Sequence, residues 1–156
     1  MRVRQPKPTD DHSPPALASR RHCARCLLLP ALAKSSRSPV IMSEIQLSSP
    51  PSDGISNVVF GRHTPDSLLV SSWDNSVRLY NTAQNAEVHQ YQHKAAVLDV
   101  CFGRSDSQCF SGSVDRSVRV CDLSTGADSH VGSHDNSVKS VAYLRNAGVL
   151  VTGRCW

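Results

Sequence analysis

The sequence predicts an all-β protein that contains part of a β-propeller. Two different motifs recur at the same spacing. The run SSWDNSVRLY at residues 71–80 returns in part further along the chain, so that Asp74 is matched by Asp115. The spacing between His93 and His134 is the same as the spacing between Asp74 and Asp115. A period of about 40–45 residues with four short strands per unit is typical of propeller blades.

The strand pattern repeats in step with these motifs. The first runs of each unit are apolar on both faces, as expected for strands sandwiched between neighbouring blades. The third runs alternate between apolar and polar residues. Turn-forming residues separate the runs, and no helical period appears. We expect strands at residues 55–60, 68–71, 77–80, 87–91, 97–102, 108–111, 118–121, around 128–131, 138–143 and 149–152.

The chain divides at Met42. Residues 1–41 hold six of the nine prolines and carry a net charge of +6, so we expect a disordered extension rich in basic residues, Pro and Ser. Met1 and Met42 are the only methionines, and we interpret residues 1–41 as a non-domain extension from an upstream start. Residues 42–156 are the expected partial propeller, with blade 1 at about 52–92, blade 2 at about 93–133 and an incomplete blade 3 at about 134–156.

Three other interpretations of residues 1–41 are weaker. The Arg-rich, acid-poor start resembles a transit peptide, but its prolines would break the amphipathic helix. The apolar run at residues 26–33 is short and interrupted by Pro30, which argues against a signal peptide. Cys23 and Cys26 form a Cys-x-x-Cys pair with His22 beside it, but no second pair follows to complete a tetrahedral zinc site. We therefore predict no metal and no cofactor.

Composition narrows the function classes. Residues 42–156 carry a net charge of −2, which argues against a basic nucleic-acid surface. No apolar run approaches the roughly 18 residues needed to cross a bilayer, so no membrane association is expected. The six cysteines show no framework spacing, which favours reduced thiols in the cytosol or nucleus.

One set of polar residues shares a single repeat. His93 is followed within the same unit by Ser111 and then by Asp115. This resembles the WD-repeat pattern, in which a loop histidine, a strand hydroxyl, a turn aspartate and a strand tryptophan form one hydrogen-bonded network. A neutral imidazole donates from one nitrogen and accepts at the other, and such buried networks are stable only when every member is satisfied. The predicted network residues are Asp74, Tyr80, His93, Ser111, Asp115, His134 and Thr152.

The chain departs from this pattern at four positions. Cys121 stands in blade 2 where tryptophan is usual, so the indole donor is missing. Tyr80 stands at that position in blade 1 and can still donate. Pro51 occupies the histidine position of blade 1, and Trp156 occupies the aspartate position of blade 3. We therefore expect the network of blade 1 to be absent or different.

The trio His93, Ser111 and Asp115 also has the residue types of a hydrolase triad. The trio is spaced by the repeat, however, and recurs in part at His134 and Thr152. No nucleophile elbow or glycine cluster for an oxyanion hole accompanies it. The sequence therefore predicts a non-enzymatic protein with no catalytic residues.

Four runs of the sequence resemble one family. They are PPSDGIS at residues 50–56, LLVSSWDNSVRLY at 68–80, YQHKAAVLD at 91–99 and VGSHD at 131–135. Together they resemble the start of the Bub-three family of mitotic spindle checkpoint proteins, over roughly residues 44–153. The Rae-one/Gle-two messenger-RNA export propellers are related and share the VLDVC type of first strand. The short first blade and the LLVSSWD text favour the checkpoint family.

The resemblance implies a monomeric seven-bladed propeller without catalytic activity, in the nucleus and at kinetochores in mitosis. It implies that linear segments of checkpoint kinases, and phosphorylated repeats of a kinetochore scaffold, bind across the top face. Ser72, Trp73 and Lys94 are the positions here that we expect to contact such partners, although Trp73 has the alternative of packing against the next blade. The alternative function is that of an export propeller that binds nucleoporin segments and RNA.

The resemblance stops after Gly153, within the third blade. Propellers typically contain 4–8 blades, so we interpret the sequence as an N-terminal fragment from a truncated gene model or splice variant. We expect such a fragment to expose apolar blade edges, which makes it prone to aggregation.

Overall fold

The computed structural model describes Arg2–Pro6 and residues 42–156. The chain forms two units, Met1–Leu47 and Ser48–Trp156. In the first unit, β1 (Arg2–Pro6) pairs antiparallel with β2 (Met42–Gln46), with Val3 opposite Ile45. Most of the segment expected to be disordered, residues 7–41, lies outside the described residues, as do Cys23 and Cys26.

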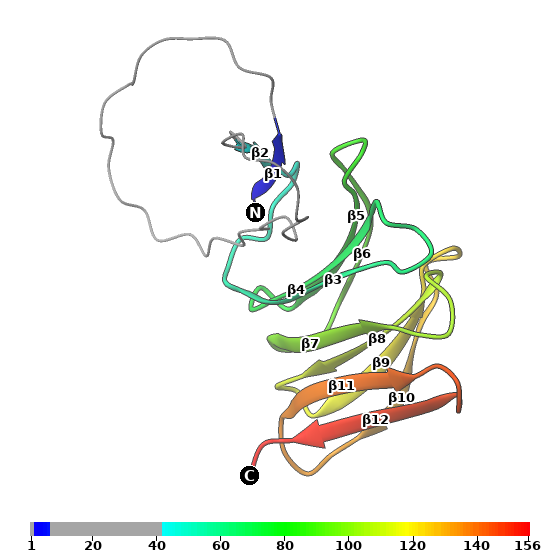
Figure 1. The fold of residues 1–156 in the computed structure, drawn as a ribbon. Helices are drawn as coiled ribbons and strands as arrows, with labels where there is room; N and C mark the ends of the chain where they lie inside the picture. The colour runs from blue at the N-terminus through cyan, green and yellow to red at the C-terminus, as the bar shows by residue number, and fades with distance from the viewer. Residues whose placement is uncertain (1, 7–41) are drawn as a thin grey trace, which may run out of the picture. The chain divides into compact units, whose positions relative to one another are not determined.

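The second unit consists of three antiparallel sheets whose strands follow one another in chain order (Figure 1). Blade 1 contains β3 (Ile55–Phe60), β4 (Ser67–Ser72), β5 (Ser76–Asn81) and β6 (Ala86–Gln92). Blade 2 contains β7 (Val97–Phe102), β8 (Gln108–Ser113), β9 (Ser117–Asp122) and β10 (Asp128–Ser133). The two strands of blade 3 are β11 (Val138–Leu144) and β12 (Val149–Arg154).

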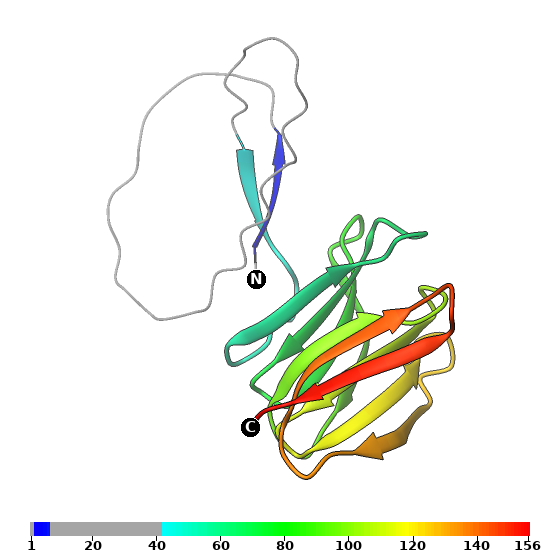
Figure 2. The same ribbon diagram turned by 60° about the horizontal axis from the view of Figure 1, so that its bottom comes forward.

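The three sheets pack against one another through their first strands. β7 of blade 2 contacts both β3 and β11, and Figure 2 shows the sheets side by side within the second unit. The described residues contain no helix. The all-β class and the partial propeller predicted from the period are confirmed, and each expected strand lies within or overlaps an observed one.

The core lies between the blades. The main cluster of buried side chains joins blades 1 and 2, because neither face of a four-stranded sheet can be buried by its own blade. A smaller cluster joins blades 2 and 3 through Val118, Val138 and Val141. The main cluster consists of Leu69, Val77, Leu79, Tyr91, Val97, Val100, Phe102, Cys109 and Cys121.

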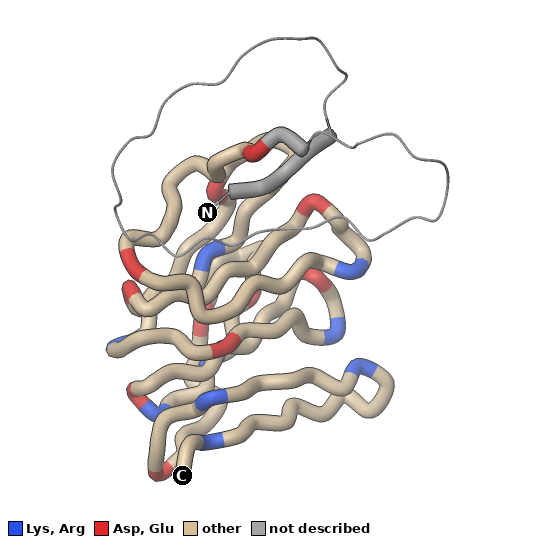
Figure 3. The backbone as a smooth tube through the Cα atoms, turned by 60° about the vertical axis from the view of Figure 1, so that its left-hand side comes forward, with Lys and Arg blue, Asp and Glu red and all other residues tan. Residues whose placement is uncertain are grey.

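Blade 3 exposes apolar side chains on its two strands. Leu144, Val149 and Val151 are 57%, 47% and 58% exposed, and Val131 on β10 is 50% exposed. Charged residues of both signs are interspersed along the second unit (Figure 3). The exposed apolar surface is therefore concentrated on the last strands of the described structure.

The tight turns that follow β4 and β8 share one conformation. Asn75 and Arg116, which occupy equivalent positions in successive repeats, have φ angles of 70° and 71°. In each turn the preceding aspartate accepts the backbone N–H two residues on, from Ser76 or from Ser117. The repeat is thus preserved at the level of backbone geometry, even where the residue types differ.

Candidate functional site

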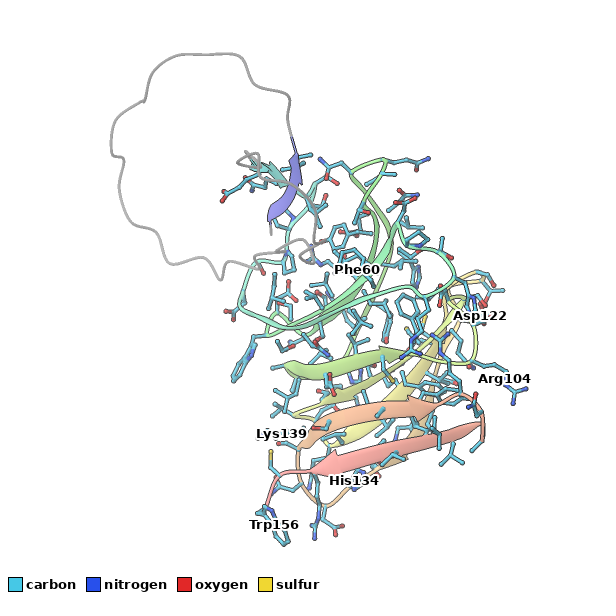
Figure 4. All side chains as sticks on the ribbon, viewed as in Figure 1. Phe60, Arg104, Asp122, His134, Lys139 and Trp156 are labelled. Carbon is cyan, nitrogen blue, oxygen red and sulfur yellow. The ribbon has the colours of Figure 1, made fainter. Side chains whose placement is uncertain are left out.

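Two kinds of connection meet at one end of the strands, which we call the top rim. It comprises the turns at residues 73–75 and 114–116 and the loops at residues 93–96 and 134–137. The His93 N–H donates to the carbonyl of Asn75 at 2.9 Å, and the His134 N–H donates to that of Arg116 at 3.0 Å. In Figure 4, His134 lies at this end of the strands, whereas Arg104 and Asp122 lie at the other.

Trp73 stands on the top rim with its side chain 55% exposed. Its backbone N–H donates to the carbonyl of Gly54 at 2.8 Å. Its indole runs along Gly54, where an added Cβ would lie 3.7 Å from the indole Cδ1. The ring is therefore positioned by its own blade and leaves much of its surface open.

The other two residues expected to contact partners are placed differently from each other. Ser72 is fully buried, and its hydroxyl donates to the carbonyl of Gly54 at 3.0 Å and accepts the N–H of Asp74 at 3.2 Å. Its side chain thus holds the turn and does not face outward. Lys94 is exposed, and its N–H donates to the Asp115 carboxylate at 3.0 Å.

The predicted residues of blade 2 come together around His93. The imidazole Nε2 lies 2.7 Å from the Ser111 hydroxyl, and Nδ1 lies 3.2 Å from the Ser117 hydroxyl and 3.4 Å from the Asp115 carboxylate. Tyr91 donates its O–H to Ser111 at 2.9 Å. Ser117 donates to Asp115 at 2.5 Å. With the proton on Nδ1, the hydrogen bonds form one chain in which each group donates to the next, from Tyr91 through Ser111, His93 and Ser117 to Asp115.

The charges of this network are set by burial and by hydrogen bonds. Burial lowers the pKa of His93 and outweighs the opposing attraction of the Asp115 carboxylate, so the imidazole is neutral at pH 7. Burial would raise the pKa of Asp115, but the hydroxyl and N–H of Ser117 and the N–H of Lys94 lower it to about 2. A neutral histidine therefore rests beside an ionised aspartate.

The arrangement does not present a nucleophile. Ser111 has no exposed surface, and its oxygen is bonded to both His93 and Tyr91. The geometry thus favours a structural role for the trio over hydrolase chemistry.

Blade 1 keeps the aspartate part of the network without a histidine. Asp74 accepts the N–H and hydroxyl of Ser76 at 3.0 and 2.5 Å and the guanidinium of Arg78 at 3.0 Å. The N–H of Ser52 donates to Asp74 at 3.0 Å, just as the N–H of Lys94 does to Asp115. The network of blade 1 is therefore different from that of blade 2 and centred on an ion pair.

Tyr80 and the blade 3 pair complete the predicted network residues. Tyr80 is buried and donates its O–H to the carbonyl of Ser49 at 2.8 Å. His134 Nε2 lies 2.8 Å from the Thr152 hydroxyl, which repeats the contact between His93 and Ser111. Trp156, at the position of the turn aspartate, is fully exposed (Figure 4).

Two aspartates that tie the blades together were not singled out in the sequence. Asp99 accepts the side-chain amide of Asn57 at 2.5 Å and the N–H of Val141 at 2.8 Å. At the opposite end from the top rim, Asp106 accepts the N–H groups of His63 and Thr64 at 2.6 and 2.8 Å. The signal for Asp99 was its place in the middle of an apolar strand, one repeat after Asn57.

A cavity of about 580 Å³ lies at the top rim beside blades 2 and 3. Its lining mixes cationic and anionic side chains and includes Lys94. The lining residues are Lys94, Asp115, Arg116, Ser117, Arg119, His130, Ser133, His134 and Asp135. No cluster of three His, Cys, Asp or Glu side chains within the described residues is arranged to hold a metal ion. None of these residues forms a helix long and apolar enough to span a membrane.

Comparison with known families agrees with the repeat. The family model "WD domain, G-beta repeat" matches residues 85–122, which contain the His93 network. The period, the four-stranded sheets and this match define the chain as a WD-repeat protein.

Relatives place the chain within that class. It is 43% identical over 117 residues to "Mitotic checkpoint protein BUB3.1" of Arabidopsis thaliana, covering 71% of this chain and 34% of the relative. It is 44% identical over 108 residues to "Mitotic checkpoint protein bub3" of Dictyostelium discoideum, covering 69% and 32%. A "Poly(A)+ RNA export protein" of Schizosaccharomyces pombe is 34% identical over 119 residues, covering 72% and 34%.

The chain is a WD-repeat protein of the Bub-three family, related to the messenger-RNA export factors. This confirms the resemblance found in the sequence. The matched region spans about a third of the length of these relatives.

Proposed function

We propose that this chain is part of a non-enzymatic scaffold of the mitotic spindle checkpoint. In this proposal, short linear segments of checkpoint kinases and of a kinetochore scaffold protein bind at the top rim. The scaffold acts in the nucleus, and at the kinetochore during mitosis. The observation that carries the proposal is the exposed indole of Trp73 on a rigid turn in a Bub-three-family chain.

The turn that bears Trp73 is fixed before any partner arrives. The neighbouring Asp74 accepts hydrogen bonds from Ser52, Ser76 and Arg78. A preorganised turn loses little conformational entropy on binding. Buried aromatic anchors carry a large share of interface energy, so an indole that is 55% exposed and already positioned suits this role.

Lys94 supplies a cation on the same rim. Its backbone is anchored to Asp115 at 3.0 Å, while its side chain is exposed and lines the cavity beside blade 2. Arg116 and Arg119 line the same cavity. Such cations pair well with carboxylate or phosphate groups of a linear segment. We therefore expect acidic or phosphorylated residues next to the group that packs on Trp73.

The test is a binding titration with fluorescent peptides. Segments from checkpoint kinases are titrated with the 156-residue chain, followed by anisotropy. We expect Trp73→Ala to weaken binding by about tenfold or more, the effect typical of an interface anchor. Phe60→Ala is the matched control, since Phe60 is also an exposed aromatic residue but ends β3 on the side away from the top rim. Equal affinities for the Trp73 variant and the unchanged chain would refute the role of Trp73.

An export function is the second candidate, and the Schizosaccharomyces pombe relative favours it. In that case a nucleoporin segment would bind more tightly than a checkpoint-kinase segment in the same titration. Contact of this region with RNA would also make binding fall steeply with salt, because counterions are released. The net charge of −2 for residues 42–156 argues against such a slope.

A further inference from the structure

Blade 2 contains a pair of cysteines that lie directly opposite each other. Cys109 on β8 pairs with Cys121 on β9, and both are fully buried. The equivalent positions of blade 1, one repeat earlier, hold Leu68 opposite Tyr80. The equivalent strand pair of blade 1 therefore forms without cysteine, and the two opposed thiols distinguish blade 2 from blade 1.

The spacing of the two strands suits a covalent bond. Residues directly opposite in an antiparallel pair have Cα atoms about 4.5–5.5 Å apart. Disulfides span Cα separations of about 4.4–6.8 Å. The two cysteines occupy directly opposite positions of the β8–β9 ladder. Cys101 has no such partner, because it lies opposite Phe110.

Polar groups of blade 1 reach both sulfurs. His89 on β6 places its Nε2 atom 3.6 Å from the Cys121 sulfur. The hydroxyl of Tyr91 lies 3.4 Å from the Cys109 sulfur and donates to Ser111. The pair thus has an imidazole at one side that can accept a thiol proton, and it adjoins the Tyr91 end of the His93 network.

The two thiols differ in acidity. The hydrogen bond from Cys109 lowers the pKa of Cys121 to about 7, with a further contribution from His89 and against the effect of burial. The hydrogen bond to Cys121, together with burial, raises the pKa of Cys109 well above its usual value. Cys121 is therefore the thiolate-forming partner, and thiolates are the reactive form of cysteine.

We propose that Cys109 and Cys121 form a modification site at which a peroxide oxidises the dithiol to a cross-strand disulfide. The Cys121 thiolate, its proton held by His89, attacks one oxygen of hydrogen peroxide, and the O–O bond breaks. Cys121 becomes a sulfenic acid, and the departing hydroxide takes the proton from His89 as water. The Cys109 sulfur then attacks the Cys121 sulfur. The S–O bond breaks, the S–S bond forms, and a second water leaves with the Cys109 proton.

Access to the pair runs through the turn next to Cys121. Residues 124, 125 and 127 of the β9–β10 connection are exposed, and local opening of such a turn requires far less than global unfolding. After oxidation, Cys121 no longer has a proton to share with His89. The disulfide would therefore remove a polar contact between blade 1 and blade 2 while bridging two strands of blade 2.

The test treats the full chain with hydrogen peroxide, blocks free thiols by alkylation and maps tryptic peptides by mass spectrometry. The sequence places cleavage sites at Arg104, Arg116, Arg119 and Lys139, so each cysteine of the pair falls on its own peptide. We expect one linked species, residues 105–116 joined to residues 120–139. It should vanish in Cys109→Ser and persist in Cys101→Ser. Absence of this species, or equal linkage to the peptides of Cys101 and Cys155, would overturn the proposal.

A second variant separates a folded site from chance pairing of cysteines. We expect His89→Gln to slow formation of the linked species by roughly tenfold, since the thiolate fraction of Cys121 falls at pH 7. His130→Gln is the control, because His130 is exposed on β10. An unfolded chain would oxidise at the same rate with either histidine replaced. Equal rates for His89→Gln and the unchanged chain would therefore also overturn the proposal.

Discussion

The side-chain amide of Asn57 donates to the carboxylate of Asp99 at 2.5 Å, across the boundary between blades 1 and 2. The other carboxylate oxygen accepts the N–H of Val141 in blade 3 at 2.8 Å. One side chain therefore joins the first strands of all three sheets. The apolar core also lies between the blades. The packing of one sheet on the next therefore depends on this core together with the polar contacts of Asp99.

Asp99→Ala should lower the free energy of unfolding by about 1–3 kcal/mol, because it leaves the Val141 N–H without its acceptor and the Asn57 amide with only the longer bond to the Val100 carbonyl at 3.3 Å. Urea unfolding followed by circular dichroism measures the change. Asp66→Ala is the control, since Asp66 is exposed and its carbonyl, which accepts from Thr82, is kept. In addition, Asn57→Ala and Asp99→Ala together should cost less than the sum of the two. Additive losses would contradict this coupling.

Gly112→Ala should destabilise the contact of blade 2 with blade 3. An added Cβ would lie 2.6 Å from Cγ1 of Val138, a fully buried side chain. Overpacking of this kind costs about 1–3 kcal/mol. Gly132→Ala is the matched control, because nothing lies within 4 Å of its added Cβ. Similar midpoints of thermal unfolding for the two variants would show that the blades are not packed as described.

The strands were predictable because each is a short apolar or alternating run bounded by turn residues, and because the runs repeat. The contact between His93 and Ser111, like that between His134 and Thr152, was expected from the resemblance to the WD-repeat pattern. Ser72 was predicted to face a partner but is buried. Its hydroxyl forms hydrogen bonds within the turn, and the spacing of the repeat does not predict the direction in which a hydroxyl points.

The proton chain was only partly predictable. Tyr91 and Ser117 were not singled out, although they flank the histidine on both sides. Tyr91 precedes the repeated motif by two positions, and its role depends on how β6 packs on blade 2. Likewise, Cys121 was interpreted as replacing the usual tryptophan, and its position opposite Cys109 was not predicted. Contacts across strands and between blades need the register, which a period alone does not supply.

Arg116→Gly should stabilise the chain by about 0.5–1 kcal/mol. Arg116 has a φ of 71°. The left-handed region costs an ordinary residue about 1–2 kcal/mol. Glycine removes this cost, but about half of the gain is lost because glycine has more conformational entropy in the unfolded chain. Asn75→Gly, at the equivalent turn with φ of 70°, should gain less because asparagine tolerates this region. Thermal unfolding measures both variants. A lower midpoint for Arg116→Gly would mean that its side chain contributes more than its backbone strain removes.

The neutral state of His93 predicts how stability changes with pH. Burial lowers its pKa in the folded chain, so the unfolded chain binds a proton first as the pH falls. Its contribution to stability is complete above about pH 6.5, the unfolded value, and is lost as the pH falls through the lower folded value. Asp115, with a pKa of about 2, adds a loss that begins near pH 4 and continues to about 2.

His93→Gln should therefore flatten the dependence of the unfolding free energy on pH just below 6.5, while the steeper loss near pH 4 remains. Glutamine lacks the titrating ring but keeps polar atoms that can bond to the Ser111 hydroxyl. His130→Gln is the matched control, because it makes the same replacement at a histidine that is exposed on β10. Urea unfolding at a series of pH values between about 4 and 8 gives the slopes directly. If His130→Gln flattened the slope and His93→Gln did not, the proton chain from Tyr91 to Asp115 would not hold a neutral imidazole.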